Sequence, residues 1–284
     1  MNERLEHPLP IRRILVALDA SQSSLNAMNT AVELAARFKA EVLGLFVEDI
    51  NLLRLAELPF AREISIFSPN ARRLRPLEME LQLRVQAARI RETLAHTAQR
   101  HGVVWDFRTA RGAVGAEVLA AGAGADLVVL GKIGRSLPGL QRSGSTVRSL
   151  LMQRQGMTLI LETHIHFAGA PVVVLYDGTE TAQKALKAAA YLSRSHDAGL
   201  LIIVIGADPD HIERYRHTAA LQARDLGADP EFRHMVRPGL SELAWRIRRE
   251  SGGPVIIPCF EDWFEGEKLC GLVDEIANPV LLIR

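Results

Sequence analysis

Glycine and hydroxyl residues gather at one place in the chain where their types and spacing could bind an anion. Gly131 and Gly134 follow a buried apolar run, and Gly144-Ser145-Thr146 comes after nine more residues. Glycines permit positive φ and let oxygen atoms approach backbone N–H groups with no Cβ in the way. The hydroxyl residues open a predicted helix, whose first N–H groups and positive dipole end favour an anion. The spacing therefore predicts a phosphate-binding loop; glycines that only form turns are the alternative interpretation.

The glycine pattern is neither a P-loop, which needs Gly-Lys-Ser/Thr, nor the GxGxxG fingerprint of dinucleotide-binding folds. A carboxylate is expected in the same crevice. Asp19 lies just past the predicted strand Ile14–Leu18, and parallel sheets bind ligands at the carboxyl ends of strands near a switch in strand order.

The elements that must position these residues alternate between short apolar runs and helical periodicities. Continuous apolar runs are typical of strands buried on both faces of a parallel sheet. Alternating strands and helices require right-handed crossovers and indicate an α/β fold. The predicted strands are Ile14–Leu18, Glu41–Val47, Val103–Thr109, Asp126–Leu130 and Met157–Leu161, and the predicted helices begin near Ser21–Ser24 and cover Leu77–His101, Gly112–Ala121 and Thr146–Gln153.

The segment Glu48–Pro76 is less regular and too long for an ordinary strand–helix connection. We interpret it as a lid that folds over a ligand or a partner, which predicts that the ligand protects it from proteases.

The pattern restarts in the second part of the chain. Pro171–Thr179 repeats the first strand and its aspartate, and at a constant offset of 158 Asp19 matches Asp177. At the same offset, Leu200–Ile205 matches Val42–Val47. Such self-similarity indicates a tandem duplication of one α/β unit.

The two predicted domains, residues 1–165 and 166–284, differ in charge. The first carries a net charge of +5 and the second −4, although the whole chain carries only +1. Proteins that neutralise a nucleic-acid backbone usually show a large positive excess, so nucleic acid is not expected as the main partner. The asymmetry favours an anionic ligand in the first domain.

The composition and the cysteines indicate a cytoplasmic globular protein. The chain is 48% hydrophobic and 24% charged, as globular proteins usually are. No uncharged apolar run reaches about 18 residues, and no signal-peptide core is present, so no membrane association is expected. Cys259 and Cys270 have neither disulfide-scaffold nor zinc spacing, which favours a reducing compartment.

The chain resembles the universal stress protein family at Ile14–Ser21, at Gly112–Val114 and at Ala125–Gly131 with the spaced glycines that follow. The spacing Gly-x2-Gly-x9-Gly-Ser matches the signature of the ATP-binding branch of that family. The resemblance covers residues 11–161 and, more weakly, 170–284. It implies two tandem flavodoxin-like or Rossmann-like α/β units, each with a roughly five-stranded parallel sheet, arranged as a pseudo-dimer.

The same resemblance implies a site for ATP or another adenine nucleotide, with Mg²⁺ or Mn²⁺ as an accompanying ion. Asp19 matches the acidic position near the adenosine, and Val47 matches the position whose backbone reads adenine. The family brings no established catalytic residue, and no protein metal site is expected. The ribose and phosphate loop corresponds to Gly131, Gly134, Gly144, Ser145 and Thr146.

The second domain departs from this pattern. Cys259 and Asp262 stand where the first two glycines would, and further acidic residues lie between 261 and 267. Gly271 has the wrong spacing to replace the third glycine. Because like charges repel, we expect nucleotide in the first domain only.

Three functions remain open from the sequence. The first is an ATP-binding protein with a regulatory or stress-protective role, in which the second domain replaces the second subunit of a family dimer. The second is an enzyme that slowly hydrolyses ATP or transfers an adenylyl group, although no general base can be named. The third is a scaffold for an unidentified protein partner that binds no nucleotide.

The last strand of each domain, Thr158–Leu161 and Val280–Ile283, is apolar and follows a helix. An exposed apolar strand edge invites pairing. We therefore predict that the two strands pair, or pack close together, within the chain, and that a chain ending near Glu162 would self-associate. A homodimer of the full chain through other surfaces stays open.

Two further groups of residues have structural and functional interpretations. His164 and His166 could ligate a metal or belong to a solvated linker at 162–170. Trp245 with its neighbouring arginines could form a basic helix for a partner or an ordinary solvated helix face.

Overall fold

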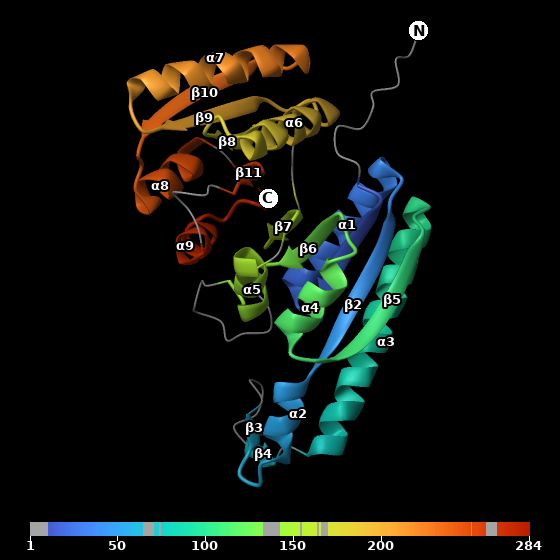
Figure 1. Cartoon of the computed structure of the whole chain (residues 1–284). Coiled ribbons are helices and arrows are strands. Elements are labelled where there is room, and N and C mark those ends of the chain that lie inside the picture. The colour runs from blue at the N-terminus through green and yellow to red at the C-terminus, as the bar shows by residue number, and fades with distance from the viewer. Residues whose placement is uncertain are drawn as a thin grey trace.

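The computed structural model describes residues 11–64, 71–73, 75–132, 143–153, 155–163, 165, 170–250, 252–259 and 266–284, and the statements below concern those residues. They form one ten-stranded sheet with helices on both faces and a small two-stranded sheet (Figure 1). The predicted α/β fold is confirmed.

The elements from β1 to β7 are called the first half of the molecule. In chain order they are β1 (Arg13–Leu18), α1 (Gln22–Phe38), β2 (Glu41–Asp49), α2 (Ile50–Glu57), β3 (Arg62–Ile64), β4 (Ala71–Arg73), α3 (Pro76–His101), β5 (Trp105–Gly112), α4 (Val114–Gly122), β6 (Leu127–Gly131), α5 (Ser145–Gln153) and β7 (Met157–Leu161).

The elements from β8 to β12 are called the second half. They are β8 (Val172–Tyr176), α6 (Glu180–Ser195), β9 (Leu200–Gly206), α7 (Pro209–Asp225), β10 (Pro230–Val236), α8 (Leu240–Glu250), β11 (Val255–Pro258), α9 (Glu267–Glu275) and β12 (Val280–Ile283).

The two halves share one sheet with the strand order β10-β9-β8-β11-β12-β7-β6-β1-β2-β5. Numbered along the chain, the five strands of each half lie in the order 3-2-1-4-5, as in Rossmann folds. The halves meet where β12 runs antiparallel to β7, with Val280 opposite Ile160 and Ile283 opposite Met157. The predicted pairing of the two terminal strands is confirmed, and it makes the molecule a pseudo-dimer.

Both halves use the same turn from first strand to first helix, at the predicted offset of 158. Ser21 caps α1 and Thr179 caps α6, and each side chain accepts a backbone N–H of the first turn, at 3.2 and 3.1 Å. The residue before each cap is left-handed, with φ of 63° at Ala20 and 82° at Gly178. Such caps satisfy N–H groups that have no partner within the helix.

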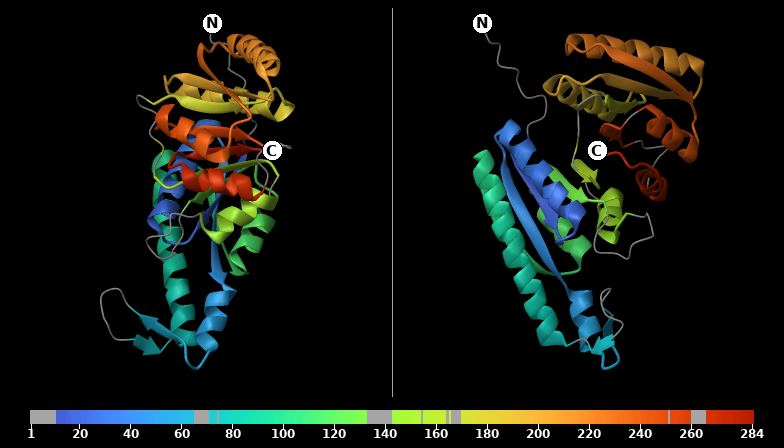
Figure 2. Two further views of the ribbon diagram at one scale, coloured as in Figure 1. Left: turned by 90° about the vertical axis from the view of Figure 1, so that its left-hand side faces the viewer. Right: turned by 180° about the vertical axis from the view of Figure 1, so that it is seen from behind.

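The helices form two layers that cover the sheet. One core lies between the sheet and α1, α3, α6 and α7, and the other lies between the sheet and α4, α5, α8 and α9. Strands β8 and β9 are buried along their whole length, as expected for parallel strands between two helical layers. Figure 2 shows both layers from the side and from behind.

The segment Glu48–Pro76, expected to be irregular, contains helix α2 and the antiparallel pair β3–β4. Asp49 starts α2, because its carboxylate accepts the Asn51 backbone N–H at 2.9 Å. Together with the start of α3, these elements project from the body of the first half (Figure 1). Within the described part of the chain, no helix is both long and apolar enough to cross a bilayer.

Candidate functional site

A cavity of about 340 Å³ opens at the carboxyl ends of β1, β2 and β6. Strand β1 pairs with both neighbours, so the switch in strand order lies here. Open α/β sheets bind ligands at such switch points, and the volume lies within the range of small-molecule pockets. The lining residues are Ala17, Leu18, Asp19, Ser21, Ser24, Leu45, Phe46, Val47, Asp49, Leu52, Leu83, Gln86, Val114, Val118, Leu130, Gly131, Gly144, Ser145, Thr146 and Val147.

The cavity brings together six of the seven residues that the sequence predicts for the site. Gly134 lies outside the described residues. The six lining residues are Asp19, Val47, Gly131, Gly144, Ser145 and Thr146.

The turn after β1 holds Asp19 on one wall of the cavity. Its Oδ1 accepts the Ser21 backbone N–H at 3.0 Å, and its own N–H donates to Ser24 Oγ at 3.3 Å. Ser24 Oγ donates to the Ser21 carbonyl at 3.0 Å. These bonds place a carboxylate and two hydroxyl groups together, although only the carboxylate was predicted as a site residue.

Strand β2 extends beyond the end of β1. The pairing of β1 with β2 ends with Leu18 opposite Phe46, whereas Val47 and the two residues after it continue to pair with β5. At Val47, therefore, β1 supplies no hydrogen-bonding partner for the side of β2 that faces away from β5. A ligand with hydrogen-bonding groups along one edge could pair with this backbone.

Apolar side chains from helices on both faces of the sheet also line the cavity, and we call them its apolar wall. Leu52 comes from α2, Leu83 from α3, and Val114 and Val118 come from α4. Apart from the Gly112–Val114 motif, this wall could not be predicted from the sequence, because apolar positions that line a cavity follow the same helical periodicity as core positions. The wall suits a flat apolar ring.

Gly131 allows close packing between β6 and the start of α1. A Cβ at this position would lie 2.6 Å from Ser23 Oγ and 2.8 Å from the backbone nitrogen of Ser24. Its φ is not left-handed. The structure thus gives a different reason for this glycine than the expected open path for phosphate oxygens.

The start of α5 forms the polar end of the cavity. The Arg148 N–H donates to the Gly144 carbonyl at 3.1 Å, which is the first helical hydrogen bond. The N–H groups of Ser145, Thr146 and Val147 therefore have no acceptor within the helix, and all three residues line the cavity. N–H groups at the positive end of a helix dipole can bind an anion.

The strand register corrects one predicted equivalence in the second half. Gly131 ends β6 and Pro258 ends β11, each opposite the last residue of the neighbouring strand. The next residues, Lys132 and Cys259, both donate their backbone N–H to that opposite residue at 2.8 Å. Pro258 and not Cys259 therefore stands at the position of Gly131.

The helix starts locate the third glycine position, which the sequence left open in the second half. In α9 the first helical hydrogen bond runs from the Cys270 N–H to the Gly266 carbonyl at 3.1 Å, in the same pattern as in α5. Gly266 therefore replaces the third glycine, not Gly271, and Glu267 stands at the position of Ser145. The predicted acidic positions Glu261, Asp262 and Glu265 lie outside the described residues.

An aromatic ring covers the turn after β8 in the second half. A Cβ on Gly178 would lie 2.4 Å from Cε1 of Tyr215, a residue of α7. The corresponding turn of the first half borders the cavity instead.

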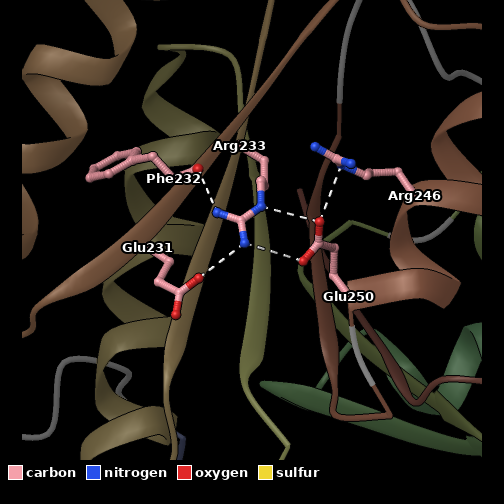
Figure 3. A network of polar contacts seen from close by, with 5 residues as sticks. All are labelled: Glu231, Phe232, Arg233, Arg246 and Glu250. Atoms are coloured by element: carbon pink, nitrogen blue, oxygen red, sulfur yellow. Dashed lines mark hydrogen bonds and ion pairs between the residues drawn. The ribbon is translucent and has the colours of Figure 1, made fainter.

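The arginines near Trp245 have structural partners. Glu250 of α8 binds Arg233 of β10 at 3.1 Å and pairs with Arg246 at 3.4 Å (Figure 3). The Arg249 guanidinium lies 5.3 Å from the centre of the half-exposed Trp245 ring. These contacts favour a structural role for the arginines over a basic surface for a partner. The other predicted group, His164 and His166, lies outside the described residues.

The fold and the cavity define an α/β protein of Rossmann strand order with a cavity at the switch point of its first half. The chain belongs to the universal stress protein family, because the model of that family matches residues 10–160.

Solved structures resemble the fold over nearly the whole chain. One is a universal stress protein from Archaeoglobus fulgidus, with a TM-score of 0.72, 16% identity and coverage of 98% of this chain and 97% of that one. Another is a protein of unknown function from Pseudomonas aeruginosa, with a TM-score of 0.63, 14% identity and coverage of 96% and 92%. No curated protein matches the sequence.

Proposed function

We propose that this chain binds ATP, or another adenine nucleotide, in the cavity of its first half and has a regulatory or stress-protective role in the cytoplasm. The observation that carries the proposal is the crevice of the first half, which combines an apolar wall, a carboxylate and the start of a helix. Family membership supports the same conclusion.

The lining residues suit the three parts of a nucleotide. The wall around Leu52 and Val118 would hold the base, beside the unpaired backbone edge at Val47. The Asp19 carboxylate would accept a ribose hydroxyl, and the N–H groups that begin at Ser145 would bind phosphate oxygens. Mg²⁺ or Mn²⁺ accompanying the phosphates fits two oxygen donors of the cavity lining, the Asp19 carboxylate and the Thr146 hydroxyl, since hard cations prefer oxygen.

The proposal places nucleotide in the first domain, residues 1–165, and none in the second, residues 166–284. Pro258 puts a ring where Gly131 has no side chain, and Glu267 puts a carboxylate where Ser145 has a hydroxyl. Instead of binding nucleotide, the second domain would pack against the first domain as the second subunit of a dimer does.

A charge substitution at Ser145 tests the site directly. Ser145→Glu copies the second half, and its carboxylate would repel the phosphates, so we expect ATP affinity to fall at least about tenfold. A glutamate in the first turn of a helix favours folding, so unfolding would not explain the loss. Ser145→Gln has nearly the same size without the charge and is the matched control.

Binding is measured by equilibrium dialysis, with product analysis over hours to detect any hydrolysis. The proposal predicts binding by the wild type and by Ser145→Gln. Wild-type protein that binds neither ATP nor AMP at about 1 mM, where the binding free energy is only about 4 kcal/mol, would contradict it.

A further inference from the structure

The two ends of the proposed phosphate loop are joined by a backbone hydrogen bond next to the cavity. We call the residues at this contact, Lys132, Ser143 and Gly144, the neck of the loop. The Gly144 N–H donates to the Lys132 carbonyl at 3.2 Å, and the Lys132 N–H donates to Leu161 of β7 at 2.8 Å. Lys132 follows Gly131 in the chain and Ser143 precedes Gly144, and both glycines line the cavity. A contact that fixes Lys132 or Ser143 therefore also fixes the backbone at the edge of the cavity.

Helix α9 of the second half contacts one side of this neck. Lys132 is 6% exposed, and its Nζ donates to the carbonyl of Ile276, the C-cap residue of α9, at 2.6 Å. Burial lowers the pKa of Lys132. The negative end of a helix dipole stabilises a cation, which offsets part of the cost of burial. The ammonium group thus binds the second half rather than extending toward the phosphates.

The same helix contacts the other side of the neck. Asp274 Oδ1 accepts the backbone N–H of Ser143 at 2.6 Å, and its Oδ2 lies 3.5 Å from Arg148 Nη1. Arg148 also pairs with Glu267 at the start of α9. The Asp274 carboxylate therefore holds the residue before Gly144 and the first turn of α5.

The reverse contact completes the interface. The guanidinium of Arg284, after β12, donates to the carbonyls of Leu151 and Met152 near the end of α5. Each half thus supplies a cation to a helix end of the other half. Figure 1 shows α5 and α9 on facing sides of the junction between the halves.

We propose that α9 of the second half positions the nucleotide site of the first half, with Asp274 as the main positioning residue. The inference rests on the proposed nucleotide site and adds that the site is complete only when both halves are assembled. Because the Ser143 N–H binds Asp274 and the Gly144 N–H binds Lys132, the donors left for phosphate begin at Ser145. Asp274 fixes where that series begins, without touching the ligand.

The test compares substitutions at adjacent positions of α9 in the full chain. Asp274→Ala removes the acceptor for the Ser143 N–H, and we expect ATP affinity to fall about tenfold, the usual scale for a charged hydrogen bond. Asp274→Asn keeps a carbonyl oxygen that can accept this N–H, and should retain most of the affinity. Glu275→Ala is the control, since its carboxylate binds Ser241 within the second half and should leave affinity unchanged.

Urea unfolding of each variant separates positioning from stability. The inference requires an affinity loss in Asp274→Ala that exceeds any loss in Glu275→Ala at equal folded fraction. Wild-type binding with no difference between these two variants would overturn the inference and leave the proposed function intact. Equal losses in Asp274→Ala and Asp274→Asn would overturn the role of the Ser143 hydrogen bond. A wild type that binds no nucleotide would overturn the proposed function and this inference with it.

A second measurement needs no variant. Coupling between two parts of a protein is reciprocal, so ATP should slow amide hydrogen exchange in α9 of the wild-type chain. Exchange in α7, which does not contact the neck, serves as the internal reference. Unchanged exchange in α9 at saturating ATP would contradict the coupling.

Discussion

The two halves of the molecule share a skeleton and differ at the crevice that the skeleton creates. Both have the same strand order, the same capped turn after the first strand and nine-residue helices, α5 and α9, before the last strand. The crevice differs: the first half has Gly131 and Ser145 where the second has Pro258 and Glu267. Because Gly131 also packs β6 against α1, Ser145 is the position at which the comparison separates a ligand requirement from a fold requirement.

The spacing of the loop changes together with its chemistry. Gly131 and Gly144 are thirteen positions apart, whereas their counterparts Pro258 and Gly266 are eight apart. Both lengths end in a helix that starts with the same backbone bond. The helix start is therefore independent of the loop, and the longer glycine loop of the first half needs another explanation, for which we propose the nucleotide.

Removal of the second half should have the largest effect. A chain that ends near Glu162 exposes β7, whose edge pairs with β12 in the full chain. The exposed apolar edge should pair with a second copy, so we expect a dimer by sedimentation. A soluble, well-folded monomer at tens of micromolar (roughly the range where weak interfaces show) would contradict the pairing.

A single methyl group at Gly131 should have the next largest effect. Gly131→Ala places a Cβ within 2.8 Å of the α1 backbone, and overpacking of this kind costs about 1–3 kcal/mol in the free energy of unfolding. Gly124→Ala is the control, because its Cβ would meet only Arg13 at 3.8 Å. Equal stability of the two variants in urea would show that β6 and α1 can separate without cost, and the packing role of Gly131 would then fail.

Strands and repeats were readable from the sequence because they depend on local patterns. The strand Met157–Leu161 and the offset of 158 are found as predicted. In the second-half loop the counterpart of Gly131 was placed wrongly at Cys259, and the third glycine could not be located, since the loop is shorter and its spacing no longer matches. The equivalent positions follow from the strand register and from the first hydrogen bond of each helix, and both are known only from the three-dimensional structure.

The site was predicted in part for a similar reason. Asp19, Val47 and the glycine loop lie at the ends of predictable strands, so their convergence follows from the topology. Leu52 lies in α2, within a segment whose sequence shows no clear helical periodicity. The contacts of Lys132 and Ser143 with α9 join residues more than 130 positions apart, and no local pattern indicates them.

The number of nucleotides bound per chain tests the central comparison most directly. Isothermal titration of the full chain with ATP should give about one site per chain, because the crevice chemistry occurs only in the first half of the described structure. The Ser145→Glu variant should weaken binding at that site at least about tenfold. Two equivalent sites in the wild type, or one site that survives Ser145→Glu at full affinity, would contradict the account.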